Sequence, residues 1–95
     1  MLLLREFKVS GHSMEPVIKN QQRVLVSKIP YLFSKPKAKE IVAFNYQGKI
    51  LIKRIAEISS DKYSVKGDNS KDSLDSRSFG SISESDILGK VIYIF

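Results

Sequence analysis

The sequence has no cysteine and no tryptophan, and its 95 residues include a single histidine, His12. Without cysteine, the chain cannot form disulfides, use a catalytic thiolate, or ligate zinc or iron–sulfur clusters through sulfur. One imidazole also excludes a metal site built from several histidines. The longest apolar run has five residues, at 91–95, far short of the roughly 18 that a membrane-spanning helix needs.

The beginning of the chain does not have the pattern of a signal peptide. Its apolar run covers only residues 1–4, and the first basic residue, Arg5, follows that run instead of preceding it. We therefore expect a chain that is cytoplasmic or at most peripheral to a membrane.

What is present is typical of one globular domain covering residues 1–95. Hydrophobic residues make up 42 % and charged residues 27 % of the chain, which are ordinary values for a folded protein. The formal net charge is +6. A chain of this length supports one modest core.

Short segments with apolar residues at every second position predict strands separated by turn residues. Gln47-Gly48 and Ser59–Asp61 are typical of tight hairpin turns, and weak helical signals occur only at Met14–Pro16 and at Ser83–Asp86, where Ser83 is a candidate N-cap. The pattern favours a mainly β fold: a small, coiled antiparallel sheet or partly open barrel with one or two helical turns. The predicted strands are Phe7–Val9, Arg23–Ser27, Glu40–Tyr46, Lys49–Ile58, Tyr63–Lys66 and Leu88–Phe95.

The segment GHSMEP places Ser13 at a junction between a strand and a turn, with Gly11 before it and Pro16 after it. A serine hydroxyl is a poor nucleophile unless a base lies within hydrogen-bond reach. His12 is the nearest candidate, but adjacent side chains of an extended stretch point to opposite faces. We therefore expect His12 to face away from Ser13.

Lys53 is the better candidate for the base. In the strand predicted at Lys49–Ile58, it shares one face with Leu51, Ile55 and Glu57. Aliphatic neighbours disfavour the ammonium form and lower the pKa of a lysine. Arg54 falls on the opposite face, where its side chain is expected to extend into water.

The segment 67–80 is polar and rich in serine, and it offers hydroxyls that could orient an amine. Asp68, Ser70 and Asp72 alternate like the ligands of a calcium loop. However, Ser73 stands where that loop needs glycine, and Phe79 stands where it needs a bidentate glutamate. We expect no metal here.

Taken together, the segments GHSMEP, IKR and GDNSKDSLDSR resemble the type I signal peptidase family of Ser–Lys endopeptidases, in particular its short form such as the maturation protease of nickel-type superoxide dismutase. The resemblance implies that Ser13 is the nucleophile and Lys53 the general base. It also implies that the hydroxyl of Ser73 hydrogen-bonds the lysine, and that Asp75 and Arg77 form a structural ion pair.

Supporting roles are expected for four further residues. The backbone N–H of Ser13 would be one oxyanion donor, and Gly11 stands where some members have a serine that supplies the second. Met14 is expected to pack beneath the turn and fix the side chain of Ser13. Asp68 and Asn69 belong to the structural loop.

The expected function is therefore cleavage of a precursor protein, at a signal peptide or N-terminal extension, after small residues. The substrate would lie extended along a strand edge. No cofactor or metal and no nucleic acid is expected, since no nucleic-acid-binding motif is present. Two alternatives remain: a self-cleaving Ser–Lys peptidase of the repressor type, and a non-catalytic module that keeps the fold to bind peptides.

Residues 28–39 combine four lysines with an apolar stretch, Tyr31, Leu32 and Phe33, between two prolines. One interpretation is a solvated loop whose aromatic rings fold back onto the core. The other is a loop that inserts these three side chains among lipid headgroups while the lysines meet anionic lipid. Peripheral contact with a membrane, or with a membrane-anchored partner, is a hypothesis that follows from the second.

Overall fold

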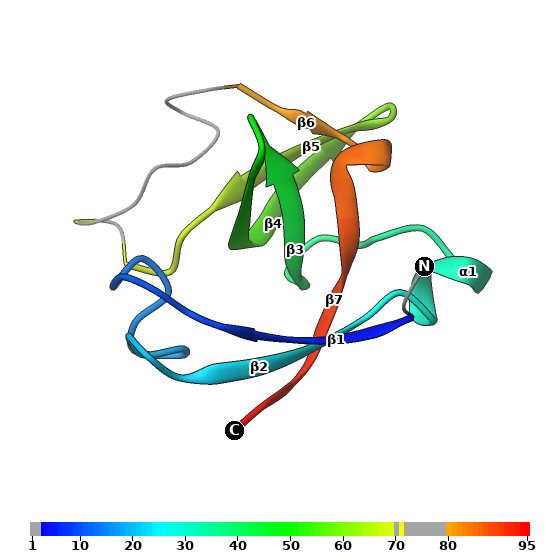
Figure 1. Ribbon diagram of the computed structural model, residues 1–95. Helices are drawn as coiled ribbons and strands as arrows, with labels where there is room; N and C mark the ends of the chain where they lie inside the picture. The colour runs from blue at the N-terminus through cyan, green and yellow to red at the C-terminus, as the bar shows by residue number, and fades with distance from the viewer. Residues whose placement is uncertain (1–2, 70, 72–79) are drawn as a thin grey trace.

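The computed structural model describes residues 3–69, 71 and 80–95, and this part of the chain is mainly β (Figure 1). Apart from the strands, it holds one four-residue helix and one 3-10 turn. The elements are β1 (Leu4–Lys8), β2 (Arg23–Ser27), α1 (Pro30–Phe33), β3 (Ile41–Tyr46), β4 (Lys49–Ser59), β5 (Lys62–Lys66), β6 (Ile82–Ser83), η1 (Glu84–Asp86) and β7 (Ile87–Ile94).

The strands form a single antiparallel sheet in the order β1-β2-β7-β3-β4-β5-β6. The predicted fold class is thus confirmed. The register shifts once between β2 and β7, once between β3 and β7, and once between β4 and β5. Such irregularities bend and twist strands, and the sheet coils on itself (Figure 1).

Two-residue turns connect β3 to β4 and β4 to β5. Gln47 and Gly48 both have positive φ, at 51° and 81°, as a type I′ turn requires. Ser60 also has a positive φ, of 55°. Both hairpins predicted from the sequence are confirmed.

The core consists of two clusters of buried side chains. The first lies among β3, β4, β5 and β7 and contains Val42, Phe44, Ile55, Tyr63, Val65, Ile82 and Ile87. The second joins β2 and β3 to the segment between β1 and β2, and contains Val9, Met14, Ile18, Val24, Val26 and Ala43.

Four local features differ from the sequence prediction. Residues Met14–Pro16 lie in a series of turns without forming a helix, although Ile18 N–H does bond Met14 O at 2.9 Å. Helix α1 and the two-residue strand β6 were not expected. The side chain of Glu57 is exposed instead of sharing the buried face of Lys53, because the register shift between Ile55 and Glu57 reverses the alternation.

The 3-10 turn at Glu84–Asp86 is present where a helical turn was predicted. Ser83 and Asp86 form a reciprocal capping arrangement at its start. No helix in the described part of the chain is long and apolar enough to cross a membrane.

Candidate active site

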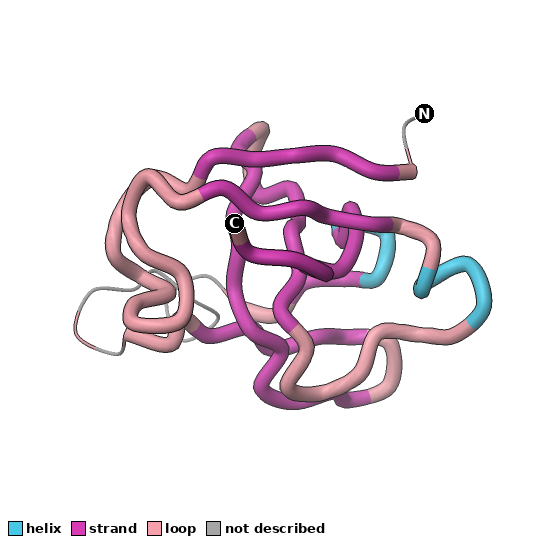
Figure 2. Tube along the Cα trace, turned by 90° about the horizontal axis from the view of Figure 1, so that it is seen from below, coloured by secondary structure: helices cyan, strands magenta, loops and turns pink. Residues whose placement is uncertain are grey.

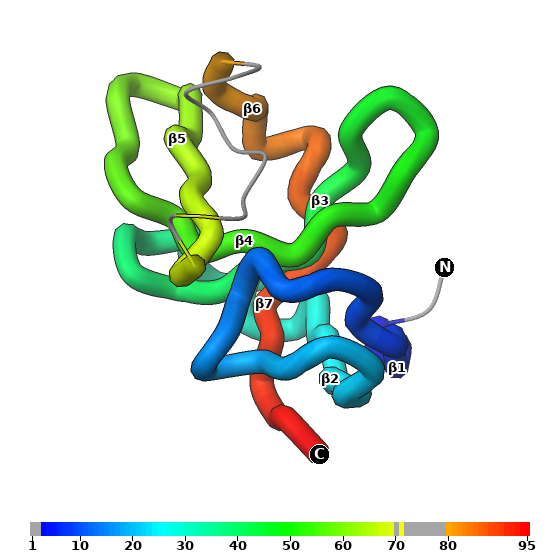
Figure 3. The backbone as a smooth tube through the Cα atoms, turned by 90° about the vertical axis from the view of Figure 1, so that its left-hand side faces the viewer, coloured from blue at the N-terminus to red at the C-terminus, as the bar shows by residue number. Residues whose placement is uncertain are grey.

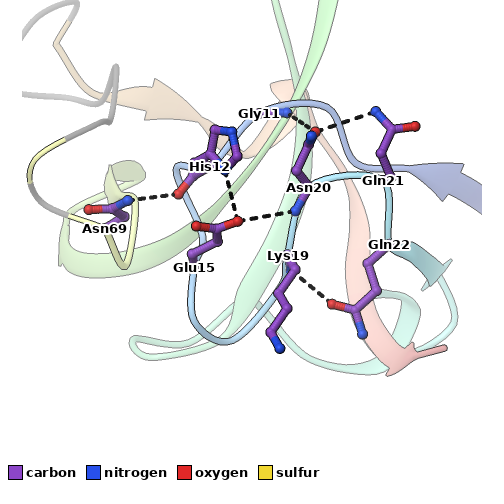
Figure 4. Close-up of polar contacts among 8 residues, drawn as sticks. All are labelled: Gly11, His12, Glu15, Lys19, Asn20, Gln21, Gln22 and Asn69. Carbon is purple, nitrogen blue, oxygen red and sulfur yellow. Dashed lines mark hydrogen bonds and ion pairs between the residues drawn. The ribbon is translucent and has the colours of Figure 1, made fainter.

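Ser13 lies in a long excursion of the chain between β1 and β2. Hydrogen bonds of 2.8 Å from Val9 N–H to Gln22 O and from Gln21 N–H to Val9 O close its base. Gly11 has a φ of 103°, in the region that favours glycine, and its N–H donates to Asn20 Oδ1 at 2.8 Å (Figure 4). The two sides of the excursion are therefore tied together just before Ser13.

Buried side chains fix this excursion to the body of the protein. Met14 and Ile18 are fully buried in the second core cluster. Met14 is thus part of the core, and its expected role in fixing the side chain of Ser13 stays a prediction. Ser13, the preceding residue, remains partly exposed.

His12 points toward Glu15, and its Nδ1 lies 2.8 Å from Glu15 Oε2 (Figure 4). The same carboxylate oxygen accepts a longer bond from Asn20 N–H. The hydrogen bond with His12 is the main reason that the pKa of Glu15 lies below its usual value. The imidazole thus belongs to the polar network that stiffens the turn.

Lys53 is buried, with only 4 % of its surface exposed, in the middle of β4. It pairs in register with Val42 of β3, and its neighbours on the same face are Leu51 and the fully buried Ile55. Its expected burial among aliphatic side chains is confirmed. Figure 3 shows the turn that follows β1 crossing close to β4.

Ser13 and Lys53 line one pocket of about 160 Å³. The pocket is lined by Ser13 and by two runs of four consecutive residues, 7–10 and 50–53. Successive residues of a strand point to opposite faces, so a wall made of four in a row follows the edge of the strand. The pocket is therefore a groove between two strand edges.

The strand pairing of β4 changes along its length. On one side β4 pairs with β3 along residues 49–54, whereas its pairing with β5 begins only at Arg54. Within the described residues, the half of β4 that carries Lys53 thus has no strand on its second side. A peptide in extended form could add to this edge by main-chain hydrogen bonds.

Asn69 connects the loop after β5 to the Ser13 turn. Its backbone N–H donates to Ser13 O at 2.8 Å, and its Nδ2 donates to His12 O at 3.0 Å. Its Oδ1 accepts a weaker bond from Lys71 N–H at 3.3 Å. One residue therefore holds two successive carbonyl groups of the turn.

Arg54 does not extend into water as the sequence suggested. Its guanidinium makes two bonds of 2.9 and 2.8 Å to the carboxylate of Asp68 and a third of 2.8 Å to Lys39 O. The hydrogen bonds to Asp68 are the main reason that the pKa of Arg54 is raised. A bidentate pair of this kind fixes the start of the loop relative to β4.

Ser73, Asp75 and Arg77 lie outside the described residues, so their expected roles remain predictions. Asn20 was not singled out from the sequence, although it bonds Gly11 and belongs to the turn. The available signal was an asparagine in the polar segment before the next strand, nine residues after Gly11, and asparagine is common in ordinary loops.

The family comparison covers nearly all of this structure. A family model described as Peptidase S24-like matches residues 6–92, which include the end of β1, the Ser13 turn, the whole of β4 and most of β7. No match was found among curated proteins. The matched range contains both Ser13 and Lys53, and the chain belongs to the Peptidase S24-like family.

Proposed function

We propose that this protein is a serine endopeptidase in which Ser13 is the nucleophile and Lys53 the general base. The observation that carries the proposal is the position of a buried lysine and a partly exposed serine in the same groove. Membership of a peptidase family supports it independently.

Burial accounts for the proposed role of Lys53. Removal from water disfavours the ammonium form of an amine, and Lys53 is almost completely buried. An uncharged amine can take the proton of the Ser13 hydroxyl as its oxygen attacks the scissile carbonyl. The ammonium so formed then returns the proton to the leaving amine.

The remaining steps use the Ser13 turn. The tetrahedral oxyanion would accept a hydrogen bond from the Ser13 backbone N–H. Gly11 has no side chain to supply a second donor, and its own N–H bonds Asn20. The acyl-enzyme is then hydrolysed by a water that Lys53 activates.

The groove also indicates the form of the substrate. An extended segment lying in the groove beside β4 would bring a backbone carbonyl close to Ser13. We propose that the substrate is a precursor protein cut at a signal peptide or N-terminal extension, after small residues. This finer assignment comes from the resemblance of the three sequence segments to type I signal peptidases.

A peptide library analysed by mass spectrometry tests the activity. Ser13→Ala and Lys53→Met are both expected to lower cleavage by at least about a hundredfold, since each removes one member of the dyad. Ser59→Ala and Lys49→Met, which change exposed residues at the two ends of β4, the strand of Lys53, are the matched controls and should cleave normally. A Lys53→Met variant that is folded and fully active at neutral pH would show that the assigned base is wrong.

Self-cleavage of the repressor type is a second candidate, because the family match concerns Ser–Lys peptidases broadly. The order of the reaction separates the two. Cleavage of the chain itself at a rate independent of protein concentration indicates self-cleavage, whereas cleavage of added peptide indicates an enzyme acting on another protein.

A further inference from the structure

Helix α1 presents apolar side chains to solvent. None of its four residues is buried, and Phe33 is 85 % exposed and Leu32 54 % exposed. Ile29, just before the helix, is 41 % exposed. Figure 2 shows α1 projecting from one end of the molecule. Isolated exposed apolar residues are ordinary, but a group of them on one projection indicates a contact surface.

The start of β1 extends this apolar surface. Lys28 N–H donates to Leu3 O at 2.9 Å, so the beginning of β1 lies beside the segment that leads into α1. Leu3 is 44 % exposed and Leu4 47 % exposed. We call Leu3, Leu4, Ile29, Leu32 and Phe33 the apolar tip.

Positive charge adjoins the apolar tip. Lys35 and Lys37 follow α1 within four residues of Phe33, and both are exposed. The carboxylate that comes next in the chain, Glu40, accepts a hydrogen bond from Tyr31 at 2.7 Å and pairs with Lys90 at 3.2 Å. Its negative charge is therefore already compensated, and the segment remains positive.

We propose that the apolar tip together with Lys35 and Lys37 binds the surface of an anionic lipid bilayer. Aromatic and aliphatic side chains enter the boundary between headgroups and acyl chains, while lysines are attracted to anionic headgroups. A second copy of the chain would bring like charges together. A nucleic acid would match the lysines but leave Leu32 and Phe33 in contact with a polar backbone.

The proposed orientation keeps the Ser13 groove outside the lipid. The apolar tip lies at the beginning of β1, and the groove lies at the end of that strand (Figures 1 and 2). The five residues of β1 span roughly 17 Å. A protein docked in this way would reach substrate segments about one strand length above the bilayer.

Co-sedimentation with vesicles tests the proposal. Vesicles of phosphatidylcholine mixed with phosphatidylglycerol are expected to bind the protein at least about tenfold more strongly than vesicles of phosphatidylcholine alone. Phe33→Ser should lower partitioning into the mixed vesicles about tenfold, because the ring no longer leaves water. Tyr93→Ser, which removes a ring that is 58 % exposed on β7, is the matched control and should bind normally.

A second pair of variants tests the charges. Lys35→Gln with Lys37→Gln should lower binding to mixed vesicles by at least about tenfold. The control, Lys49→Gln with Lys62→Gln, removes the same net charge from exposed positions on other elements. Equal losses in the two pairs would reduce the effect to net charge and overturn the proposal.

Two further results would also overturn it: equal binding to the two kinds of vesicle, or an oligonucleotide that binds with the same dependence on Phe33. Ser13→Ala should bind lipid like the unchanged protein. The lipid surface and the peptidase function can therefore fail independently.

Discussion

Asn69 holds the turn of the proposed nucleophile through the backbone carbonyl groups of His12 and Ser13, and it is not among the residues that line the groove. Asn69→Ala removes the bond of 3.0 Å from Nδ2 to His12 O, while the backbone bond to Ser13 O can remain. We expect a loss of about 1 kcal/mol of stability and a fall in kcat of about tenfold with little change in KM, because the turn is less well positioned. Peptide-cleavage kinetics measure both constants.

Two variants separate positioning from stability. Asn69→Asp keeps the shape of the side chain but cannot donate to His12 O when ionised, so it should behave like Asn69→Ala. Asn45→Ala removes a hydrogen bond that is also exposed to solvent. In it, Asn45 Oδ1 accepts from Gly48 N–H at 3.2 Å in the β3–β4 turn. If Asn45→Ala lowered kcat as much as Asn69→Ala does, the effect would be one of general stability.

Individual residues were predictable from the sequence where strand alternation alone determines the environment. The burial of Lys53 follows from its aliphatic neighbours two positions before and after it. The pairing of Arg54 with Asp68 does not, because it depends on how the loop after β5 returns to β4. Local periodicity carries no information about such contacts between elements.

Strand β7 has one position at which only glycine fits. A Cβ placed on Gly89 would lie 2.7 Å from Ser27 O and 2.8 Å from Val26 Cγ1, both on the adjacent strand β2. Gly89→Ala must therefore push β7 away from β2 in the middle of the sheet. We expect a loss of about 2–3 kcal/mol in the free energy of unfolding, measured by urea denaturation.

Gly48→Ala is the comparison for this prediction. A Cβ at Gly48 meets nothing within 4 Å, but its φ of 81° is unfavourable for alanine. We expect it to cost about 1 kcal/mol. A loss from Gly89→Ala no greater than that from Gly48→Ala would mean that the sheet accommodates the added methyl group.

At the scale of elements, the sequence signals were strong where turn chemistry bounds a strand. Gln47-Gly48 indicates both the end of β3 and the start of β4, and the structure agrees. Strand β6 has only two residues, Ile82 and Ser83, too few to show alternation. It exists because Tyr63 and Lys62 of β5 pair with it, which is a tertiary effect.

The arrangement of the whole molecule follows from pairings that no local pattern specifies. Strand β7, from the end of the chain, lies between β2 and β3. The groove with Ser13 and Lys53 exists because the coiled sheet brings the end of β1 near the first half of β4. A mainly β fold was predictable from alternation, whereas this strand order was not.

Acid stability is a property of the whole molecule, and two carboxylates with lowered pKa values are expected to contribute to it. The hydrogen bond with His12 holds the pKa of Glu15 below 4.5. Burial alone would raise the pKa of Glu40, but hydrogen bonds from Lys37 N–H, Tyr31 and Lys90 outweigh it and leave that pKa lowered. A lowered pKa in the folded state contributes stability above the unfolded value, and this contribution is lost as the pH falls below about 4.5.

The contribution of these two carboxylates to the free energy of unfolding is therefore expected to change little between about pH 7 and pH 5. It should decline as the pH falls further. Denaturant titrations at a series of pH values measure this curve. Glu15→Gln with Glu40→Gln should be less stable at pH 7 and should show a flatter decline in acid, because neither amide titrates. A double variant whose stability fell with pH as steeply as that of the unchanged protein would place the acid sensitivity in other carboxylates.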